Sequence, residues 1–374
     1  MKILLLCCIL LTAYPLRAQD RGPVNILIPS FKSSTSYERI PGTIGKRTAT
    51  ILSLQLWKTL IKSSPASSNP FGRANFYLNL AAPPPGSQNE AVELARRQKQ
   101  AINLVLWGKA TEYGGGIVVE SQLDITPDEL GRRLGARVWE VIIRSGQKSY
   151  VFAADVPEWQ YEFAPVVIST DVLPQLNNPA GLKMFSRPDM ESTVLGYLGR
   201  GVKAEQHIGD YTYVLATASG RKGWIYLPNL SKSQSEVIDF TSGVIRVFRK
   251  DWNGALELLG KVVNNQITPS AIRVAAYLYM GLAADKLGDE VMSLQFLAEA
   301  HRLNPYSKAV AQYLCMGRLS ALARMKQKGV IGAELRKKVE DARAILSTNA
   351  VLFAADDKWM LQVTRFLTEA DRLL

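Results

Sequence analysis

Leu182-Lys-Met-Phe-Ser186 opens the stretch that decides the fold of the middle of the chain, and four further runs follow: Thr193-Val-Leu-Gly-Tyr-Leu198, Val202–Ile208, Tyr211–Thr217 and Gly223-Trp-Ile-Tyr226. Glycine, proline and aspartate separate these runs. Short apolar runs at such close spacing are typical of the strands of a small barrel. The sequence therefore predicts an all-β unit over residues 182–232.

The same stretch resembles a bacterial SH3 (SH3b) domain, chiefly through Gly201-Val202 and Gly223-Trp224. The resemblance implies a barrel that binds ligands, often cell-wall peptides, and does not catalyse. The candidate groove residues are Tyr197, Tyr211, Tyr213 and Trp224. For Trp224 two interpretations stay open: packing in the barrel core, which is preferred, or lining a peptide groove as a rigid aromatic.

The amino terminus has the pattern of a secretory signal peptide over residues 1–18. Lys2 precedes an apolar run from Ile3 to Ala13, and the small residue Ala18 marks the expected cut. The run is too short to span a bilayer, so no transmembrane anchor is expected after cleavage. We therefore expect a periplasmic or secreted protein.

The chain is basic, with 45 Lys and Arg against 33 Asp and Glu and a formal net charge of +12. Such an excess favours anionic or acidic partners in the envelope, although most of these charges only solvate the surface. No nucleic-acid recognition motif accompanies the charge, so nucleic-acid binding is not expected.

Residues 21–152 are expected to form an α/β domain with the order β-α-β-α-β-β-β and both helices on one face of a mixed sheet. The last two strands are predicted at Ala136–Arg144 and Ser149–Ala153. Gly114-Gly-Gly116 fits a hairpin turn. It lacks the lysine and the serine or threonine of a phosphate loop.

This first region resembles the amino-terminal domain of TolB and the related CsgG family. The resemblance rests on Ile26-Leu-Ile-Pro29 and on Leu104-Val-Leu-Trp-Gly108 before a glycine hairpin. It implies a periplasmic docking part of an envelope machine, and one branch of the fold group activates peptidoglycan synthases. No catalytic residues come with it. Residues 153–181, which contain Pro157, Pro165 and Pro174, are predicted to be a linker.

Residues 236–374 are expected to be all-α, because apolar residues recur at helical spacing and Gly288-Asp289 provides a helix stop followed by a helix cap. The region resembles a tetratricopeptide repeat (TPR) through its expected packing residues Tyr277, Gly281, Ala300 and Pro305. The resemblance implies a small solenoid whose concave face holds a peptide or a partner protein. A purely structural stack remains the alternative. Cys315 would be an inert buried thiol.

Catalytic chemistry is not expected. His207 and His301 fall in different regions, and no metalloprotease, nucleophile-elbow or Walker motif occurs. We therefore expect no catalytic residues, no metal and no cofactor. The function predicted is that of an exported adaptor that binds an envelope protein or a peptide, with the peptidoglycan stem peptide as one candidate. The alternatives are a wall-targeted enzyme or an activator of one, and a self-assembling part of an envelope machine.

Overall fold

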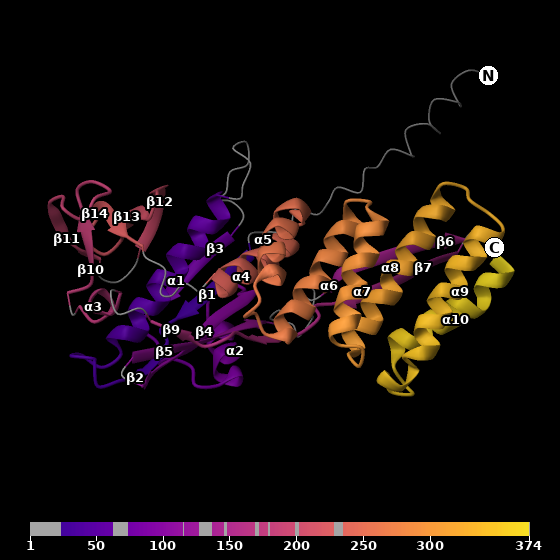
Figure 1. Cartoon of the computed structure of the whole chain (residues 1–374), viewed down its shortest axis with the longest axis horizontal. Helices are drawn as coiled ribbons and strands as arrows, with labels where there is room; N and C mark the ends of the chain where they lie inside the picture. The colour runs from indigo at the N-terminus through magenta and orange to yellow at the C-terminus, as the bar shows by residue number, and fades with distance from the viewer. Residues whose placement is uncertain are drawn as a thin grey trace, which may run out of the picture.

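The computed structural model describes residues 24–62, 74–114, 116–126, 137–145, 148–168, 172–178, 180–198, 202–227 and 235–373. Within these residues, strands dominate the part before residue 227, and every regular element after residue 235 is helical. Figure 1 shows an elongated molecule with a small sheet at one end and the last helices at the other. The expected succession of a sheet-rich part and a helical part is confirmed. The leader expected over residues 1–18 lies outside the described residues.

A seven-stranded mixed sheet forms the first part, and its main path runs β3-β1-β4-β5-β8. β1 pairs with β3 and β4 in parallel, whereas β4 and β5 form an antiparallel hairpin. Gly114 lies in the hairpin turn at φ +57°, a conformation that glycine adopts without strain. The strands are β1 (Val24–Pro29), β2 (Lys32–Ser34, on β4), β3 (Ala74–Asn79), β4 (Leu104–Tyr113), β5 (Gly116–Ile125), β8 (Gln160–Glu162) and β9 (Val166–Val167, on β5).

α1 (Thr43–Lys62) and α2 (Gln88–Arg96) cover opposite faces of this sheet. On β1, Ile26 packs in the core cluster that includes α1, whereas Leu27 packs in a smaller cluster with Ala91 and Ala95 of α2. The prediction of both helices on one face is therefore wrong. The chain crosses from β1 to β3 in one direction and from β3 back to β4 in the other. Right-handed crossovers in opposite directions place their helices on opposite faces.

β6 (Arg137–Ser145) and β7 (Lys148–Asp155) pair only with each other and do not join the seven-stranded sheet. Their predicted place as the last strands of that sheet is wrong. Trp139, Val141 and Phe152 are buried instead against the last helices, along which the hairpin runs in Figure 1. An alternating apolar pattern requires that one face of a hairpin be covered, but it does not specify which element covers it.

A five-stranded antiparallel sheet follows, with the order β11-β10-β14-β13-β12. A short helix, α3 (Leu173–Leu176), precedes it, and β8 and β9 of the first sheet fall within the stretch predicted as a linker. Thr212, Val214 and Ile225 are buried inside the small sheet. Its strands lie within two residues of the predicted runs: β10 (Leu182–Phe185), β11 (Val194–Leu198), β12 (Val202–Ile208), β13 (Tyr211–Ala216) and β14 (Arg221–Tyr226).

Residues 235–373, which we call the helical region, contain seven α-helices, each packed on the next. Asp251 and Asp289 begin the second helix of successive pairs, and each carboxylate accepts a bond from a first-turn amide, Gly254 N and Met292 N respectively. The predicted cap at Asp289 is therefore present, and Asp251 caps α5 in the same way. The helices are α4 (Ser235–Phe248), α5 (Trp252–Asn264), α6 (Ser270–Lys286), α7 (Glu290–Leu303), α8 (Lys308–Gln327), α9 (Ala333–Thr348) and α10 (Lys358–Leu373), with a 3-10 turn at Ala350–Leu352.

The residues singled out for repeat packing lie at the contact of α6 with α7 and just beyond it. A Cβ on Gly281 would come within 2.7 Å of Leu297 Cδ2, so only glycine allows these helices to approach so closely. Ala300 is buried, and Tyr277 is half-buried with its ring centroid 6.3 Å from that of Phe296. Pro305 is exposed in the turn after α7.

Buried aromatic residues join the first sheet to the helical region. The hydroxyl oxygens of Tyr161 on β8 and Tyr279 on α6 are 3.0 Å apart. The ring centroid of Phe240 on α4 lies 4.8 Å from the ring centroid of Tyr161 and 5.8 Å from that of Phe163. These contacts belong to one hydrophobic cluster that extends from β1 through the five-stranded sheet to α10. The three parts of the chain therefore share a continuous core.

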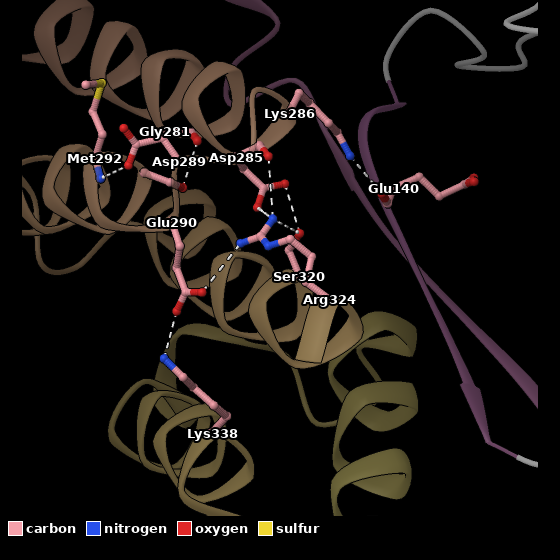
Figure 2. A network of polar contacts seen from close by, with 11 residues as sticks. Glu140, Gly281, Asp285, Lys286, Asp289, Glu290, Met292, Ser320, Arg324 and Lys338 are labelled. Carbon is pink, nitrogen blue, oxygen red and sulfur yellow. Dashed lines mark hydrogen bonds and ion pairs between the residues drawn. The ribbon is translucent and has the colours of Figure 1, made fainter. Parts of the chain in front are cut away.

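A polar network ties α6, α7, α8 and α9 together (Figure 2). Arg324 Nη1 lies 2.5 Å from the buried carboxylate of Asp285, and Ser320 donates to the same carboxylate at 2.9 Å. Arg324 also lies 3.8 Å from Glu290, which pairs with Lys338 at 2.7 Å. The network holds the second and third helix pairs in a fixed relation.

The contact between the first sheet and the helical region also contains a buried acid, Glu236 at the start of α4. Its carboxylate accepts a hydrogen bond from Ala164 N at 3.5 Å. The residue as a whole is 3% exposed. Burial raises the pKa of Glu236 from 4.5 to about 7, against the opposing effects of hydrogen bonds from Ala164 and Thr268. The folded state therefore binds the Glu236 proton more tightly than the unfolded state does. The stabilisation that results from this proton is complete below pH 4.5 and is lost as the pH rises to about 7.

We therefore expect the free energy of unfolding to fall between pH 4.5 and about 7, by at most about 1.4 kcal/mol per pH unit for one group. Glu236→Gln should make this part of the profile less steep, because position 236 then has no proton to lose. Asp124 and Asp239, whose pKa values burial raises to about 6, still titrate in the variant. Urea unfolding at half-unit pH steps measures the slope. Glu340→Gln, at an exposed position on α9, serves as control and should leave it unchanged. A wild-type profile that rises over this interval would contradict the assignment.

Candidate functional site

Four aromatic residues form two tilted ring pairs on the outer side of the five-stranded sheet. Tyr211 lies opposite Tyr226 with ring centroids 5.5 Å apart, and Tyr213 lies opposite Trp224 at 5.1 Å. All four are half-buried, whereas the residues between them along the strands are buried on the opposite side. We call Tyr211, Tyr213, Trp224 and Tyr226 the aromatic face. Such rings present rigid apolar surface at small entropic cost.

The structure brings together three of the four predicted groove residues. Trp224 is on the outer side, so the preferred interpretation of it as a core residue is wrong. Gly223 and Ile225 turn inward instead, and strand alternation then directs Trp224 outward. Tyr197 is 45% exposed on β11, opposite Lys183, and is not part of the two ring pairs. Tyr226 was not predicted, although its spacing of two residues from Trp224 places it on the same face.

A cavity of about 250 Å³ borders the aromatic face and shares Tyr226 with it. α3 supplies one wall, and β10 with the loop after it supplies another. Because the stretch before β10 was predicted only as a linker and a turn, sequence reasoning missed this cavity. Its wall is mostly apolar and includes Pro174, Phe185, Met190 and Tyr226. Asn178 contributes an amide group and Lys183 an ammonium group.

Basic side chains flank this surface. Lys183 is exposed on β10 and lines the cavity. Lys222 precedes Trp224 on β14, and its hydrogen bond with Glu205 at 2.9 Å raises its pKa above the usual value. The combination of aromatic rings, an apolar hollow and a lysine can bind an apolar ligand that carries a carboxylate.

The inner face of the helical region, which would be the concave face of a repeat array, is covered by the protein's own chain. α1 packs on α4, β8 packs on α6, and the β6–β7 hairpin packs on α8 and α10. Trp139 meets Tyr313 edge-on at 5.5 Å, and Phe152 meets Phe366 at 5.2 Å. This face is therefore occupied without any partner.

Helix side chains also bind the hairpin through its main chain. Lys286 donates to Glu140 O at 3.0 Å, a contact drawn in Figure 2. The other bonds of this kind join Gln312 to Ala153 O, Tyr313 to Asp155 O and Gln362 to Val151 O, at 3.5, 2.8 and 2.8 Å. Four helix side chains therefore hold the main chain of the hairpin against the helical region.

The remaining residues of chemical interest stay apart. His207 lies on β12, with Nδ1 2.8 Å from Tyr211 O, and His301 lies on α7, well separated from β12 in Figure 1. Cys315 is buried on α8, and burial raises the pKa of its thiol to about 12, so the unreactive protonated form dominates. Among the described residues, no cluster of three or more His, Cys, Asp or Glu could hold a metal ion, and no helix is long and apolar enough to cross a membrane.

Comparison of the chain with protein-family models, with curated proteins and with solved structures finds no match.

Proposed function

We propose that this protein is an exported, non-catalytic adaptor of the cell envelope that binds a peptide on its aromatic face. The observation that carries the proposal is the presence of two tilted aromatic contacts beside a cavity that shares Tyr226. Tryptophan and tyrosine dominate binding surfaces because they bury large areas while losing little side-chain freedom. The nearby lysine favours a ligand with a free carboxylate.

The resemblance of residues 182–232 to an SH3b domain supports this choice of surface. Five short strands form an antiparallel sheet over these residues, and the aromatic residues alternate onto one side of it. The ligand class that fits is a short peptide with apolar and carboxylate groups. A segment of an envelope protein and the stem peptide of peptidoglycan both satisfy this description.

The helical region takes a supporting role in the proposal. Its resemblance to TPR arrays implies a concave receptor face, but α1, β8 and the β6–β7 hairpin cover that face. The region would therefore hold the chain together, and a partner protein would bind its outer helices or the aromatic face.

Trp224→Ala should weaken binding to soluble stem-peptide fragments or to an envelope peptide by about tenfold or more, because the ring is half of one of the two aromatic pairs. Titration of the full chain with purified muropeptides, and capture of cross-linked proteins from intact envelopes, measure the two ligand sources separately. Tyr113→Ala, at a 79% exposed position on β4, is the matched aromatic control and should bind as the wild type does.

If neither muropeptides nor envelope peptides bind the wild-type chain above background, the proposal fails. Digestion of purified sacculi distinguishes the alternative of a wall enzyme or an activator of one. Release of wall fragments by the protein alone would replace the adaptor proposal with an enzyme. Release only when a wall enzyme is added would instead indicate an activator.

A further inference from the structure

Among the described strands, β3 ends the seven-stranded sheet and pairs with β1 alone, in an unbroken parallel register from Ala74 to Asn79. Its other edge has no strand partner within this part of the chain. Ser30 N donates to Asn79 O at 3.3 Å, and this bond fixes the alternation along the strand. Asn79 and the residues two and four before it direct their main-chain groups to β1. Phe76 and Leu78 therefore direct their N–H and C=O groups to the open edge.

The open edge borders a second cavity, about 490 Å³ in volume. Leu54, Trp57 and Leu60 of α1 line it together with β3, and Val202 and Ala204 of β12 line its far side. β12 is itself the last strand of the five-stranded sheet. An apolar hollow therefore lies beside two sheet edges, and within the described part of the chain no further strand lies between them.

β3 lacks the features that normally protect an edge strand. Its sequence, Ala-Asn-Phe-Tyr-Leu-Asn, has no charge and no proline, and its pairing with β1 has no bulge. β12 across the cavity has both a register shift after Ala204 and the charges of Lys203 and Glu205. Proteins protect free edges with such charges and bulges because unprotected edges recruit other strands.

We propose that the edge of β3 is a docking site for an extended segment of a partner polypeptide. The segment would add as a strand, bonding to the main chain of Phe76 and Leu78, and would insert alternate apolar side chains beside Trp57 and Leu60. Among the described lining residues only Lys203 is charged, which favours an acidic residue at one end of the segment. The described lining amounts to twelve residues, fewer than the roughly 20–30 per side of a stable protein–protein interface, so a short peptide fits better than a second copy.

The test uses an array of random decapeptides probed with the labelled full chain, followed by hydrogen exchange of individual amides. In the free protein the amides of Phe76 and Leu78 should exchange quickly and that of Tyr77 slowly. Bound peptide should slow the first two and leave Tyr77 unchanged. The selected peptides should alternate apolar residues and end in aspartate or glutamate.

Leu78→Pro removes one outward donor at an edge position where proline is tolerated, and should weaken the selected peptide by about tenfold. Ala74→Lys, a second variant, places a protecting charge on the same edge and should also weaken binding. Val167→Lys, at an exposed position on β9, should not. Trp224→Ala should bind the peptide normally, which separates this site from the aromatic face.

Three results would overturn the proposal. The first is an array without selected peptides, and the second is unchanged affinity in both edge variants. The third is slow exchange of Phe76 and Leu78 in the free protein. If the slow exchange depended on protein concentration, a second copy of the chain would occupy the edge of β3. If it did not, another segment of the same chain would cover that edge.

Discussion

Trp139→Ala is expected to lower the free energy of unfolding by about 3–5 kcal/mol, the range for removing a large aromatic side chain from a core. Trp139 is fully buried between the β6–β7 hairpin and α8, where its ring meets that of Tyr313 edge-on. A Cβ added to Gly317 would lie 3.8 Å from the Trp139 ring. Removal of this ring leaves a cavity between two parts of the chain that cannot collapse independently. Guanidinium unfolding followed by circular dichroism measures the loss.

Two comparisons make this expectation specific. Trp139→Phe keeps an apolar ring and should lose less than the alanine variant. Ile142→Ala changes a residue on the same strand that is 44% exposed on the opposite side, and should cost about 0.5 kcal/mol or less. A Trp139→Ala chain as stable as the Ile142→Ala chain would show that the hairpin does not pack on the helices in solution.

Arg324→Met is expected to cost about 3 kcal/mol, because it leaves the Asp285 carboxylate buried without its partner. The side chain of Asp285 is only 2% exposed, so water cannot replace the guanidinium. The same denaturant titration measures this loss. Lys338→Met breaks a more exposed pair with Glu290 and should cost less than about 1 kcal/mol.

A double variant tests the cause. Asp285→Asn removes the buried charge, and Ser320 can still bond to the amide that replaces it. Asp285→Asn combined with Arg324→Met should therefore be more stable than Arg324→Met alone, recovering about half of the loss. If the two single losses add in the double variant, the pair is not the source of the effect.

Local features were predictable from the sequence because they depend on near neighbours along the chain. Asp289 caps α7 through an amide three residues away, and the strands of the five-stranded sheet follow a period of two between turn residues. The same period places Tyr211 and Tyr213 on one side of β13, but it does not say whether that side faces the core or the solvent. Trp224 has the polar Lys222 and the apolar Tyr226 two residues away, so the pattern does not decide between core and surface for it.

The position of the hairpin could not be predicted for a different reason. Its apolar residues alternate in the same way whether the hairpin extends a sheet or covers a helix bundle. The contacts that decide between these outcomes connect distant residues, such as the bond from Tyr150 to Glu369, 219 positions apart. The cavity beside the aromatic face has the same origin, since α3 and β14 meet only in the folded chain.

The packing of this hairpin on α8 and α10 has a consequence for biogenesis. A ribosome completes residues 137–155 long before it reaches residue 358, where the last covering helix begins. An isolated two-stranded hairpin is marginally stable in water, and until α10 is synthesised the apolar side of this hairpin lacks one of the helices that bury it. Nascent chains that stop before α10 would lack the contact of Phe152 with Phe366. Such truncated products would expose apolar surface that chaperones and proteases bind.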